Sequence, residues 1–525
     1  MPGNKNRIIY LIGGLFLLIL WFRPATPSTD DKPLLWGHLE PGPYTIGFET
    51  LELVDHSRTF LHKYDCEGMP RMIECGRPMQ ISIWYPALRT ASKAGVVFAE
   101  YIFPMPEDDD FFNLLADLQN REIYSRLFGR LTNSYALIQD LMNVSMAAIR
   151  EAPPVDSVFP LVIYFPDLNG TLTENVVLFE YLASHGFVVA VSPSLGTYLL
   201  NAEKSSIDLE TAVRDGEFIK AVMHDRPYVD KKKTGVIGHS SGIAAALLAT
   251  MRGSDLDAVV SLAGHGFDST DLELLRSSIF YNPSRMRIPH LLIAAGDAFD
   301  SAIVEPYRYS ERYVAGMAGL TDDDLNAYGL LSKLIPDSTG NLPGNGNPRF
   351  EMVCRGILDF LGAYLNNDEK RLAARAAGAG DDSLSLTLSP LPATAAPPLE
   401  EQFVATFRQD GLEEARRIYD DFRESYPDTA FFRASCLNDL QLQYLRAGQT
   451  EMAVEIGEIN RDAYPDSAEV LFILALSYVY NREIESALEG FDKLLELLPG
   501  DSSLSPVRKT ELENYVRRYM EALKN

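Results

Sequence analysis

The sequence predicts a doubly wound, mostly parallel α/β sheet followed by an all-α domain of helical repeats. Three observations carry this prediction. Short apolar runs alternate with amphipathic segments over the first 370 residues, a serine stands between one such run and a helix pattern, and landmarks recur every 34 residues near the C-terminus. Alternation of strands and helices is typical of a parallel sheet covered by helices on both faces.

The strand candidates are short β-rich runs, several of which are continuously apolar. They are Gln80–Tyr85, Leu161–Phe165, Phe187–Ser192, Thr234–Gly238, Ala258–Leu262 and His290–Ala295. Continuous apolar runs are expected for strands that are buried on both faces. Helix patterns lie between them at Glu174–Ser184, Ser206–His224 and Ser241–Met251. The stretch 108–150 interrupts this alternation, and we expect it to be a helical lid or side-packed insertion.

The run GVIGHSSG at residues 235–242 has the G-x-S-x-G pattern of a nucleophile elbow, in which a serine lies on a tight strand-to-helix turn. The pattern alone is weak, but here a predicted strand precedes it and a helix of small residues follows it. Gly238 and Gly242 would let the strand and the helix approach closely. We therefore expect Ser240 to occupy the nucleophile position, unless the turn is a glycine-rich turn of another parallel sheet.

The core, at about residues 41–365, resembles the α/β-hydrolases of the dienelactone hydrolase and platelet-activating-factor acetylhydrolase group. The segments that carry the resemblance are PGPYTIGF (41–48), ISIWYPA (81–87), FPLVIYFPDLNG (159–170), EYLASHGFVVAVSPSLGT (180–197), GVIGHSSG (235–242) and AVVSLAG (258–264). The resemblance implies a serine carboxylic-ester hydrolase that works through an acyl-enzyme, with Ser240 as the nucleophile.

The histidine of the expected triad is missing from its usual place. In such enzymes a histidine after the last strand takes the proton of the serine. The chain has eight histidines, and none follows His290. His265 follows the strand candidate Ala258–Leu262, so it is the replacement base that the sequence offers, or else an ordinary loop histidine. Asp297 or Asp300 could act as the acid, and Asp268 is a further orienting group for His265. We expect structural roles for the remaining candidates, His185, His224, His239 and His290.

Two backbone N–H groups are the candidate oxyanion donors. Ser241 would offer its N–H at the start of a helix, and Leu168 would offer a second one from the loop after Leu161–Phe165. That loop reads Pro166-Asp167-Leu168-Asn169-Gly170, where relatives tend to carry a glycine-rich turn. Proline has no N–H to donate. A carboxylate at Asp167 would repel an oxyanion if it pointed inward, and it would be harmless if it pointed to solvent.

The C-terminal region has an internal repeat. Tyr444, Ala453 and Pro465 recur 34 positions later as Tyr478, Ala487 and Pro499. This period, with small residues where two helices cross and a proline after the second helix, is the tetratricopeptide signature. We expect such repeats over residues 399–525, ending in a capping helix at about 506–523. Residues 371–398 are rich in Ala, Gly, Ser and Pro and are expected to form a linker that does not pack.

The N-terminus and the overall charge bear on location and partners. Lys5 and Arg7 precede an apolar run at residues 8–22, which is typical of a signal peptide or a short signal anchor within residues 1–30. We therefore expect residues 31–370, the hydrolase-like domain, to be exported to a periplasmic or extracellular location, free or tethered to the membrane. The net charge of −26 argues against a nucleic-acid partner. Cys66 and Cys75 flank a short loop that could close as a disulfide.

Two classes of function follow. The first is an exported serine esterase or lipase-like hydrolase acting on carboxylic, including lipid, esters. The second is a catalytically inactive pseudohydrolase that binds a ligand, or that binds a protein or peptide through its repeats. The histidine and cysteine spacings match no metal-binding motif, and we expect neither a metal nor a cofactor.

Overall fold

The computed structural model describes residues 33–61, 69, 75–89, 95–102, 132, 134–198, 202–253, 255–264, 266–296, 303–317, 319–335, 346–376, 386–426, 431–501 and 504–524. These residues form two compact units, residues 1–394 and 395–525. The predicted signal segment, the Cys66 side of the proposed disulfide, His265, Asp297 and Asp300 all lie outside the described residues.

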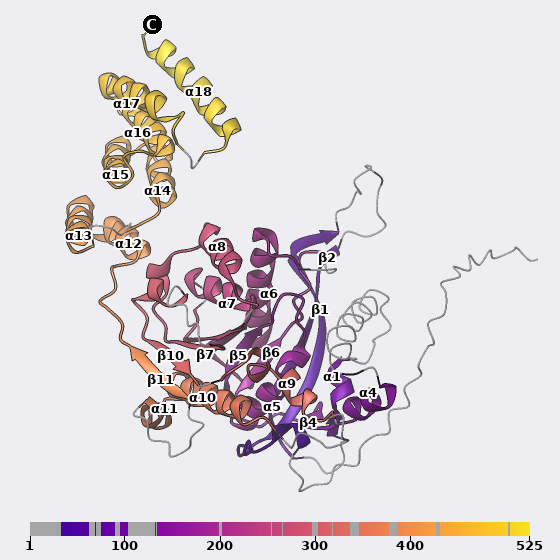
Figure 1. Cartoon of the computed structure of the whole chain (residues 1–525). Coiled ribbons are helices and arrows are strands. Elements are labelled where there is room, and N and C mark those ends of the chain that lie inside the picture. Colours follow the sequence, from indigo (N-terminus) through magenta and orange to yellow (C-terminus); the bar gives the residue numbers. More distant parts are fainter. Residues whose placement is uncertain are drawn as a thin grey trace, which may run out of the picture. The chain divides into compact units, whose positions relative to one another are not determined.

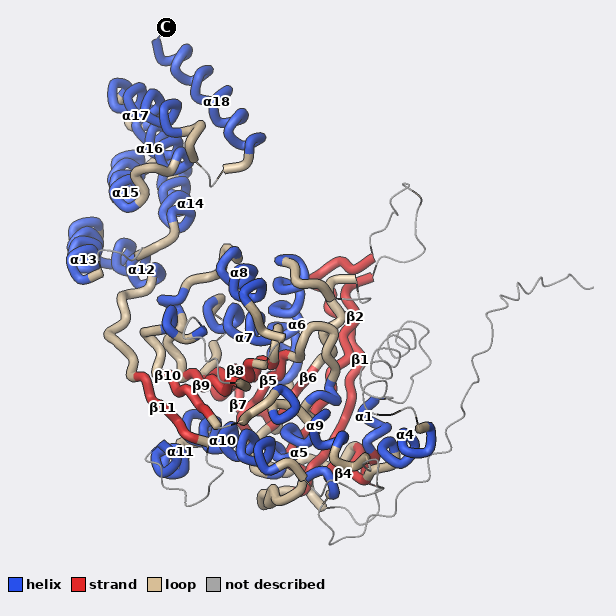
Figure 2. Tube along the Cα trace, in the orientation of Figure 1, coloured by secondary structure: helices blue, strands red, loops and turns tan. Residues whose placement is uncertain are grey.

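The first unit is built on one sheet of eleven strands, in the order β11-β10-β9-β8-β7-β5-β6-β2-β1-β4-β3 (Figures 1 and 2). Strands β5 to β10 run parallel to one another, β2 runs antiparallel to both β1 and β6, and β11 runs antiparallel to β10. The strands are β1 Thr45–Leu61, β2 Cys75–Ala87, β3 Gly95–Val97, β4 Ser145–Arg150, β5 Phe159–Phe165, β6 Val188–Val191, β7 Val229–His239, β8 Ala258–Ala263, β9 His290–Ala294, β10 Arg312–Gly316 and β11 Thr387–Leu391. The predicted, mostly parallel α/β sheet is confirmed.

Helices cover both faces of the sheet (Figure 1). One buried cluster packs α5 and α10 against the sheet, and a second packs α6, α7 and α8 against the opposite face. The helices of this unit are α1 Phe98–Ile102, α4 Tyr135–Met142, α5 Val176–Ser184, α6 Ser206–His224, α7 Gly242–Met251, α8 Ser269–Ser277, α9 Tyr328–Ser332, α10 Pro348–Leu365 and α11 Glu369–Ala376; the short 3-10 helices are η1 Leu34–Trp36, η3 Leu172–Glu174, η4 Pro283–Arg285, η6 Glu305–Tyr307 and η7 Asp322–Asp324. No described helix is long and apolar enough to cross a bilayer.

Two sequence predictions need correction. The stretch 108–150 is not helical throughout: α4 is followed by β4, which joins the sheet between β1 and β3. The expected linker 371–398 also packs in part, because α11 extends into it and β11 pairs antiparallel with β10 at the edge of the sheet. Its few large apolar side chains suffice for this, since Leu386 and Leu388 are buried in the core. Composition alone underestimated them because an edge strand has to bury only alternate residues.

The second unit consists of α12 Glu400–Asp410, α13 Leu412–Ser425, α14 Ala434–Arg446, α15 Thr450–Ala463, α16 Ala468–Tyr480, α17 Ile484–Leu497 and α18 Pro506–Lys524. The pair α16 and α17 repeats the pair α14 and α15, with the same helix lengths, 34 positions further along. Ala453 and Ala487 are fully buried at corresponding positions in this repeat. The helical C-terminal domain is therefore confirmed, and its assignment to the tetratricopeptide family stays a prediction.

Glu180 of α5 has a buried carboxylate that binds three other elements, η1, α1 and β4. Its oxygens accept hydrogen bonds from Trp36 Nε1 (2.9 Å), from Tyr101 Oη (2.7 Å) and from the backbone N–H groups of Ala147 and Ala148 (2.9 Å each). Burial raises the pKa of this carboxyl, although the four donors act against the shift. Glu180 thus fastens η1, α1 and β4 to one helix.

We expect Glu180→Leu to lower the free energy of unfolding by about 3 kcal/mol, because it leaves buried donors without an acceptor. Glu180→Gln keeps one acceptor oxygen and should cost about 1 kcal/mol. Urea unfolding followed by circular dichroism measures both, with Glu203→Gln on the exposed side of the same unit as the control. A loss for Glu180→Leu no larger than that of the control would contradict this role.

His290, at the start of β9, supplies a second prediction. Its ring is fully buried, with Nε2 2.9 Å from Ser261 Oγ, and burial, with Arg312 nearby, lowers its pKa to about 3. In the unfolded chain this histidine has a pKa of about 6.5 and takes up a proton below that pH, whereas the buried ring in the folded protein stays neutral. The free energy of unfolding therefore falls as the pH drops below about 6.5. We expect the wild type to lose about 2 kcal/mol more than His290→Asn between pH 7 and pH 5. Equal losses in urea melts at the two pH values would rule this out.

Candidate functional site

The turn from β7 to α7 is a nucleophile elbow. Ser240 has a positive φ of 52°, a left-handed conformation that is uncommon for a non-glycine residue. A Cβ at Gly238 would lie 2.7 Å from the Ile243 Cα, and a Cβ at Gly242 would lie 2.3 Å from the Phe165 carbonyl oxygen. Both glycines are therefore needed for the close approach of strand, turn and helix. The local structure predicted around Ser240 is confirmed.

The Ser240 side chain is covered. The residue is only 3% exposed, and its Oγ makes no hydrogen bond within the described part of the chain. Gly266 is the cover, because a Cβ there would lie 1.9 Å from Ser240 Oγ. The neighbouring Ser241 hydroxyl donates to the Gly266 carbonyl oxygen (3.3 Å). The serine hydroxyl is thus in place on its elbow, but nothing described activates it.

The two candidate oxyanion donors do come together. Leu168 N lies 2.7 Å and Ser241 N lies 3.1 Å from the same atom, Asp167 Oδ1. We call these two N–H groups the oxyanion site. The sequence left open whether Asp167 points inward or to solvent; the structure shows that its carboxylate occupies the oxyanion site. A carbonyl oxygen of a substrate would have to displace this carboxylate to reach either donor.

Beneath the elbow, Glu174 fixes the loop that carries Asp167. Its buried Oε2 lies 3.2 Å from each of three groups, the Asp167 backbone N–H, the Tyr164 hydroxyl and His239 Nδ1. Burial acts to lower the pKa of His239, but the hydrogen bond and the charge of Glu174 outweigh it, so that the pKa is raised. His239 faces this buried acid rather than the Ser240 hydroxyl, as expected of the residue before the nucleophile.

Lys204 binds Gly266, the residue that covers Ser240, and the start of α8. Its Nζ donates to the Gly266 carbonyl oxygen (3.1 Å) and to the carboxylates of Asp268 (2.9 Å) and Asp271 (2.8 Å). Asp268 also caps the N-terminus of α8 through its side chain. In the structure Asp268 therefore serves as a cap and as a partner of Lys204, and its role as an orienting group for His265 stays a prediction.

Gly264 and Gly266, the described neighbours of His265, both lie at the site. A Cβ at Gly264 would lie 2.5 Å from Asp322 Oδ1, whereas Gly266 contacts Ser240. His265 itself, Asp297 and Asp300 stay predictions. His185, His224 and His290 contact structural partners, namely the Tyr181 carbonyl oxygen, Thr234 Oγ1 and Ser261 Oγ.

A small cavity of about 60 Å³ adjoins the oxyanion site. Leu168 and Ser241 line it together with apolar side chains of α6 and α8, such as Leu209 and Leu274, and Ser240 is not among the lining residues. Typical sites for drug-sized ligands have about 300–1,000 Å³. The described cavity is therefore too small for a large acyl chain.

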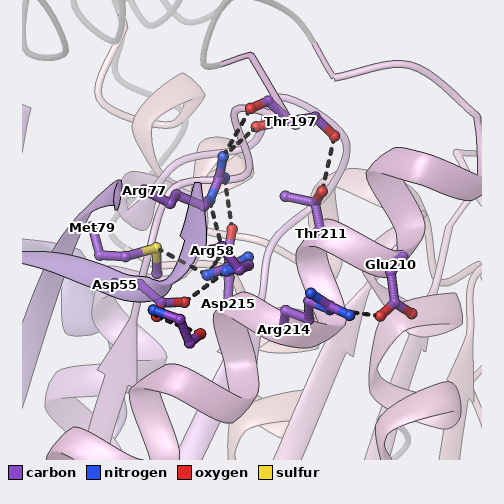
Figure 3. A network of polar contacts seen from close by, with 11 residues as sticks. Asp55, Arg58, Arg77, Met79, Thr197, Glu210, Thr211, Arg214 and Asp215 are labelled. Atoms are coloured by element: carbon purple, nitrogen blue, oxygen red, sulfur yellow. Dashed lines mark hydrogen bonds and ion pairs between the residues drawn. The ribbon is translucent and has the colours of Figure 1, made fainter. Parts of the chain in front are cut away.

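One wall of this cavity is the loop that contains Gly196, which a buried ion-pair network holds in place (Figure 3). Arg77 pairs with both oxygens of Asp215 at 2.8 Å and also donates to the carbonyl oxygens of Gly196 (2.9 Å) and Thr197 (3.2 Å). Arg58 pairs with the same aspartate at 2.8 Å. The network ties β1 and β2 to α6 and to the loop that forms this wall.

Sequence reasoning found Ser240, Ser241 and Leu168 but missed Glu174, Lys204 and Asp322. No sequence pattern identified these three residues, because the groups that each of them contacts at the site are distant from it in the sequence. No group of three or more potential metal ligands occurs among the described residues.

The Glu174–His239 pair predicts a pH dependence of stability. Because the folded-state pKa of His239 is raised above its unfolded value, the pair stabilises the fold fully below pH ~6.5, and this contribution is lost as the pH rises through the folded pKa. We expect Glu174→Gln to destabilise the protein more at pH 6 than at pH 9. Unfolding free energies from urea melts at both values check this, and a penalty that grows with pH would refute it.

No protein-family model matches the chain, and no curated protein matches it. Among solved structures, the chain is similar to a ferulic acid esterase from Streptomyces cinnamoneus, with 18% identity over 66% of this chain and 93% of that chain and a TM-score of 0.42. A likeness this distant does not bear on activity. The strand order and the elbow at Ser240 are the evidence that the first unit is an α/β sheet of the hydrolase type.

Proposed function

We propose that the first unit is a pseudohydrolase, a protein that keeps the hydrolase fold and binds without cleaving. The observation that carries the proposal is the Asp167 carboxylate in the oxyanion site, at 2.7 and 3.1 Å from its two donors. Ester hydrolysis needs those donors free for the oxygen that becomes negative in the transition state. A fixed negative charge at that position opposes the reaction.

The state of Ser240 supports the same proposal. A serine hydroxyl becomes a nucleophile when a base within about 2.6–3.2 Å takes its proton. Ser240 Oγ is buried and has no such partner within the described residues, and the sequence has no histidine after His290. Loss of a triad member leaves about 10³–10⁴-fold acceleration over water, and loss of one oxyanion donor costs a further factor of about 10²–10³. The two defects together would leave almost no catalysis.

The proposal includes the finer expectations from the sequence. Export through the N-terminal segment, to a periplasmic or extracellular location, would place this unit outside the cytoplasm. Pairs of stacked helices such as α14–α15 and α16–α17 suit the binding of a peptide or a partner helix. On this proposal the protein binds its ligands without cleaving them, and the helical unit binds a protein or peptide partner.

A second candidate is a carboxylic-ester hydrolase in which His265 replaces the missing base. One observation favours it: Gly266, the next residue, contacts Ser240 Oγ. An active enzyme of this kind would also have to move Asp167 out of the oxyanion site. Its substrates would be small esters, in keeping with the small cavity beside Leu168 and Ser241.

Fluorophosphonate labelling separates the two candidates. We expect the wild type and Ser240→Ala to label equally weakly and to hydrolyse p-nitrophenyl butyrate at the same rate, because Ser240 is not activated. Ser277→Ala, on the exposed side of α8, controls for labelling at other serines. Labelling and turnover that disappear in Ser240→Ala would overturn the pseudohydrolase proposal. If they also disappear in His265→Ala, the second candidate is supported.

A further inference from the structure

A second depression, whose lining shares only Thr211 with the cavity beside the elbow, lies between β1 and α6. It is an open groove of about 580 Å³, lined by three residues of β1 and by side chains from the N-terminal half of α6. Sites for small organic ligands have about 300–1,000 Å³. Ser240 and the two oxyanion donors, Leu168 and Ser241, do not line it. The groove therefore has the size of a ligand site that the proposed function does not use.

Arg58 of β1 lines the groove with a guanidinium that two aspartates hold in place (Figure 3). Its Nε lies 2.6 Å from Asp55 Oδ2, and its Nη2 lies 2.8 Å from Asp215 Oδ1. The third nitrogen, Nη1, has no partner within the described part of the chain, so it is the group that Arg58 can offer to a ligand. Because the side chain is already ordered, little side-chain entropy is lost when it binds.

Arg214 of α6 brings a second guanidinium to the groove (Figure 3). Its Nε donates to Glu210 Oε1 (2.8 Å), and its side chain is 47% exposed. Both Glu210 oxygens also accept hydrogen bonds from Arg252 Nη1, at 2.7 Å each. The Glu210 carboxylate is thus bound by arginines, whereas Nη1 and Nη2 of Arg214 contact none of the described residues. These two groups remain as donors for a ligand.

The start of α6 adds further donors. Ser206 and Ile207 are the first two residues of this 19-residue helix, and both are exposed in the groove. The first N–H groups of a helix have no partner within it, and the helix dipole favours an anion there. Thr59, across the groove on β1, is a further exposed residue with a hydroxyl. The groove therefore offers a ligand several donors, while its carboxylates are bound by arginines, and this combination favours an anion.

We propose that this groove binds the phosphate group of a small organic phosphate monoester. A phosphate has three terminal oxygens that accept hydrogen bonds, and arginine side chains and helix N-termini bind it well. Arg58 Nη1 would bind it from the β1 side, and Arg214 and the start of α6 from the other side. Ile207, which is 60% exposed, would pack against the organic part. A carboxylate has only two oxygens and would leave some of these donors without an acceptor.

Isothermal titration calorimetry of the full chain with phenyl phosphate, in a buffer free of phosphate, tests the proposal. We expect the wild type to bind and Arg214→Gln to bind at least ~10-fold more weakly, because hydrogen bonds between charged groups are among the strongest in proteins. Arg214 is exposed, so this variant should fold, and thermal unfolding checks that it does. The proposal is wrong if the wild type does not bind phenyl phosphate, or if Arg214→Gln binds it equally well.

Arg517→Gln is the matched control. Arg517 of α18 pairs with Glu513 four positions earlier, as Arg214 pairs with Glu210, and it is exposed as well. It belongs to the helical unit and does not line the groove. We expect its loss to change the affinity by less than ~2-fold, since solvent and salt screen an exposed charge. An equal loss of affinity in both variants would reveal a general effect of net charge and would overturn the proposal.

Three analogues test the chemical class. Benzoate carries a carboxylate in place of the phosphate and should bind at least ~10-fold more weakly, because it accepts fewer charge-assisted hydrogen bonds. Inorganic phosphate should also bind more weakly, because it has no organic part to contact Ile207, and uncharged phenol should not bind. A benzoate affinity equal to that of phenyl phosphate would overturn the choice of phosphate. An equal affinity for inorganic phosphate would overturn the choice of a monoester.

Ser240→Ala separates this site from the elbow. Ser240 does not line the groove, so the variant should bind phenyl phosphate as the wild type does, whether or not the serine can react. Failure of this inference and failure of the pseudohydrolase proposal therefore give different signals. Loss of phenyl phosphate binding in Ser240→Ala would place the ligand at the elbow and contradict a site in the groove.

Discussion

The structure around the elbow depends on one carboxylate oxygen that receives two backbone N–H groups. Asp167 Oδ1 joins the loop after β5 to the start of α7, which follows the neighbouring strand β7. Unpaired N–H groups in a buried turn would be costly, so this oxygen satisfies donors that an enzyme would keep for its substrate. Glu174 holds the backbone of Asp167 from below. The two backbone donors are therefore satisfied without a ligand.

The elbow itself carries backbone strain at Ser240. Ser240 retains a left-handed backbone, which costs about 1–3 kcal/mol at a non-glycine residue. Tight packing at Gly238 and Gly242 maintains it. Gly266, whose carbonyl oxygen accepts a hydrogen bond from Lys204, lies directly against the Ser240 hydroxyl. The fold thus holds Ser240 in the geometry of a nucleophile elbow, and within the described residues its hydroxyl has no hydrogen-bond partner.

Much of this could be predicted from the sequence. The strands β5 to β9 and the helices α6 and α7 were found because buried strands and amphipathic helices leave clear apolar patterns. The elbow was found because its glycines are required by close backbone approach. The short strands β4 and β11 were missed, since five or six residues with alternate burial resemble loop or helix sequence. The direction of the Asp167 side chain depends on Ser241 N, which lies 74 positions away, and no local pattern encodes it.

The central claim is that the Asp167 carboxylate accepts hydrogen bonds from both donors of the oxyanion site in the resting protein. The amide proton chemical shifts of Leu168 and Ser241 test it most directly, because a charge-assisted hydrogen bond moves an amide proton strongly downfield. We predict that both resonances lie downfield in the wild type and move upfield together in Asp167→Ala. Resonances at ordinary positions that do not respond to this substitution would contradict the account.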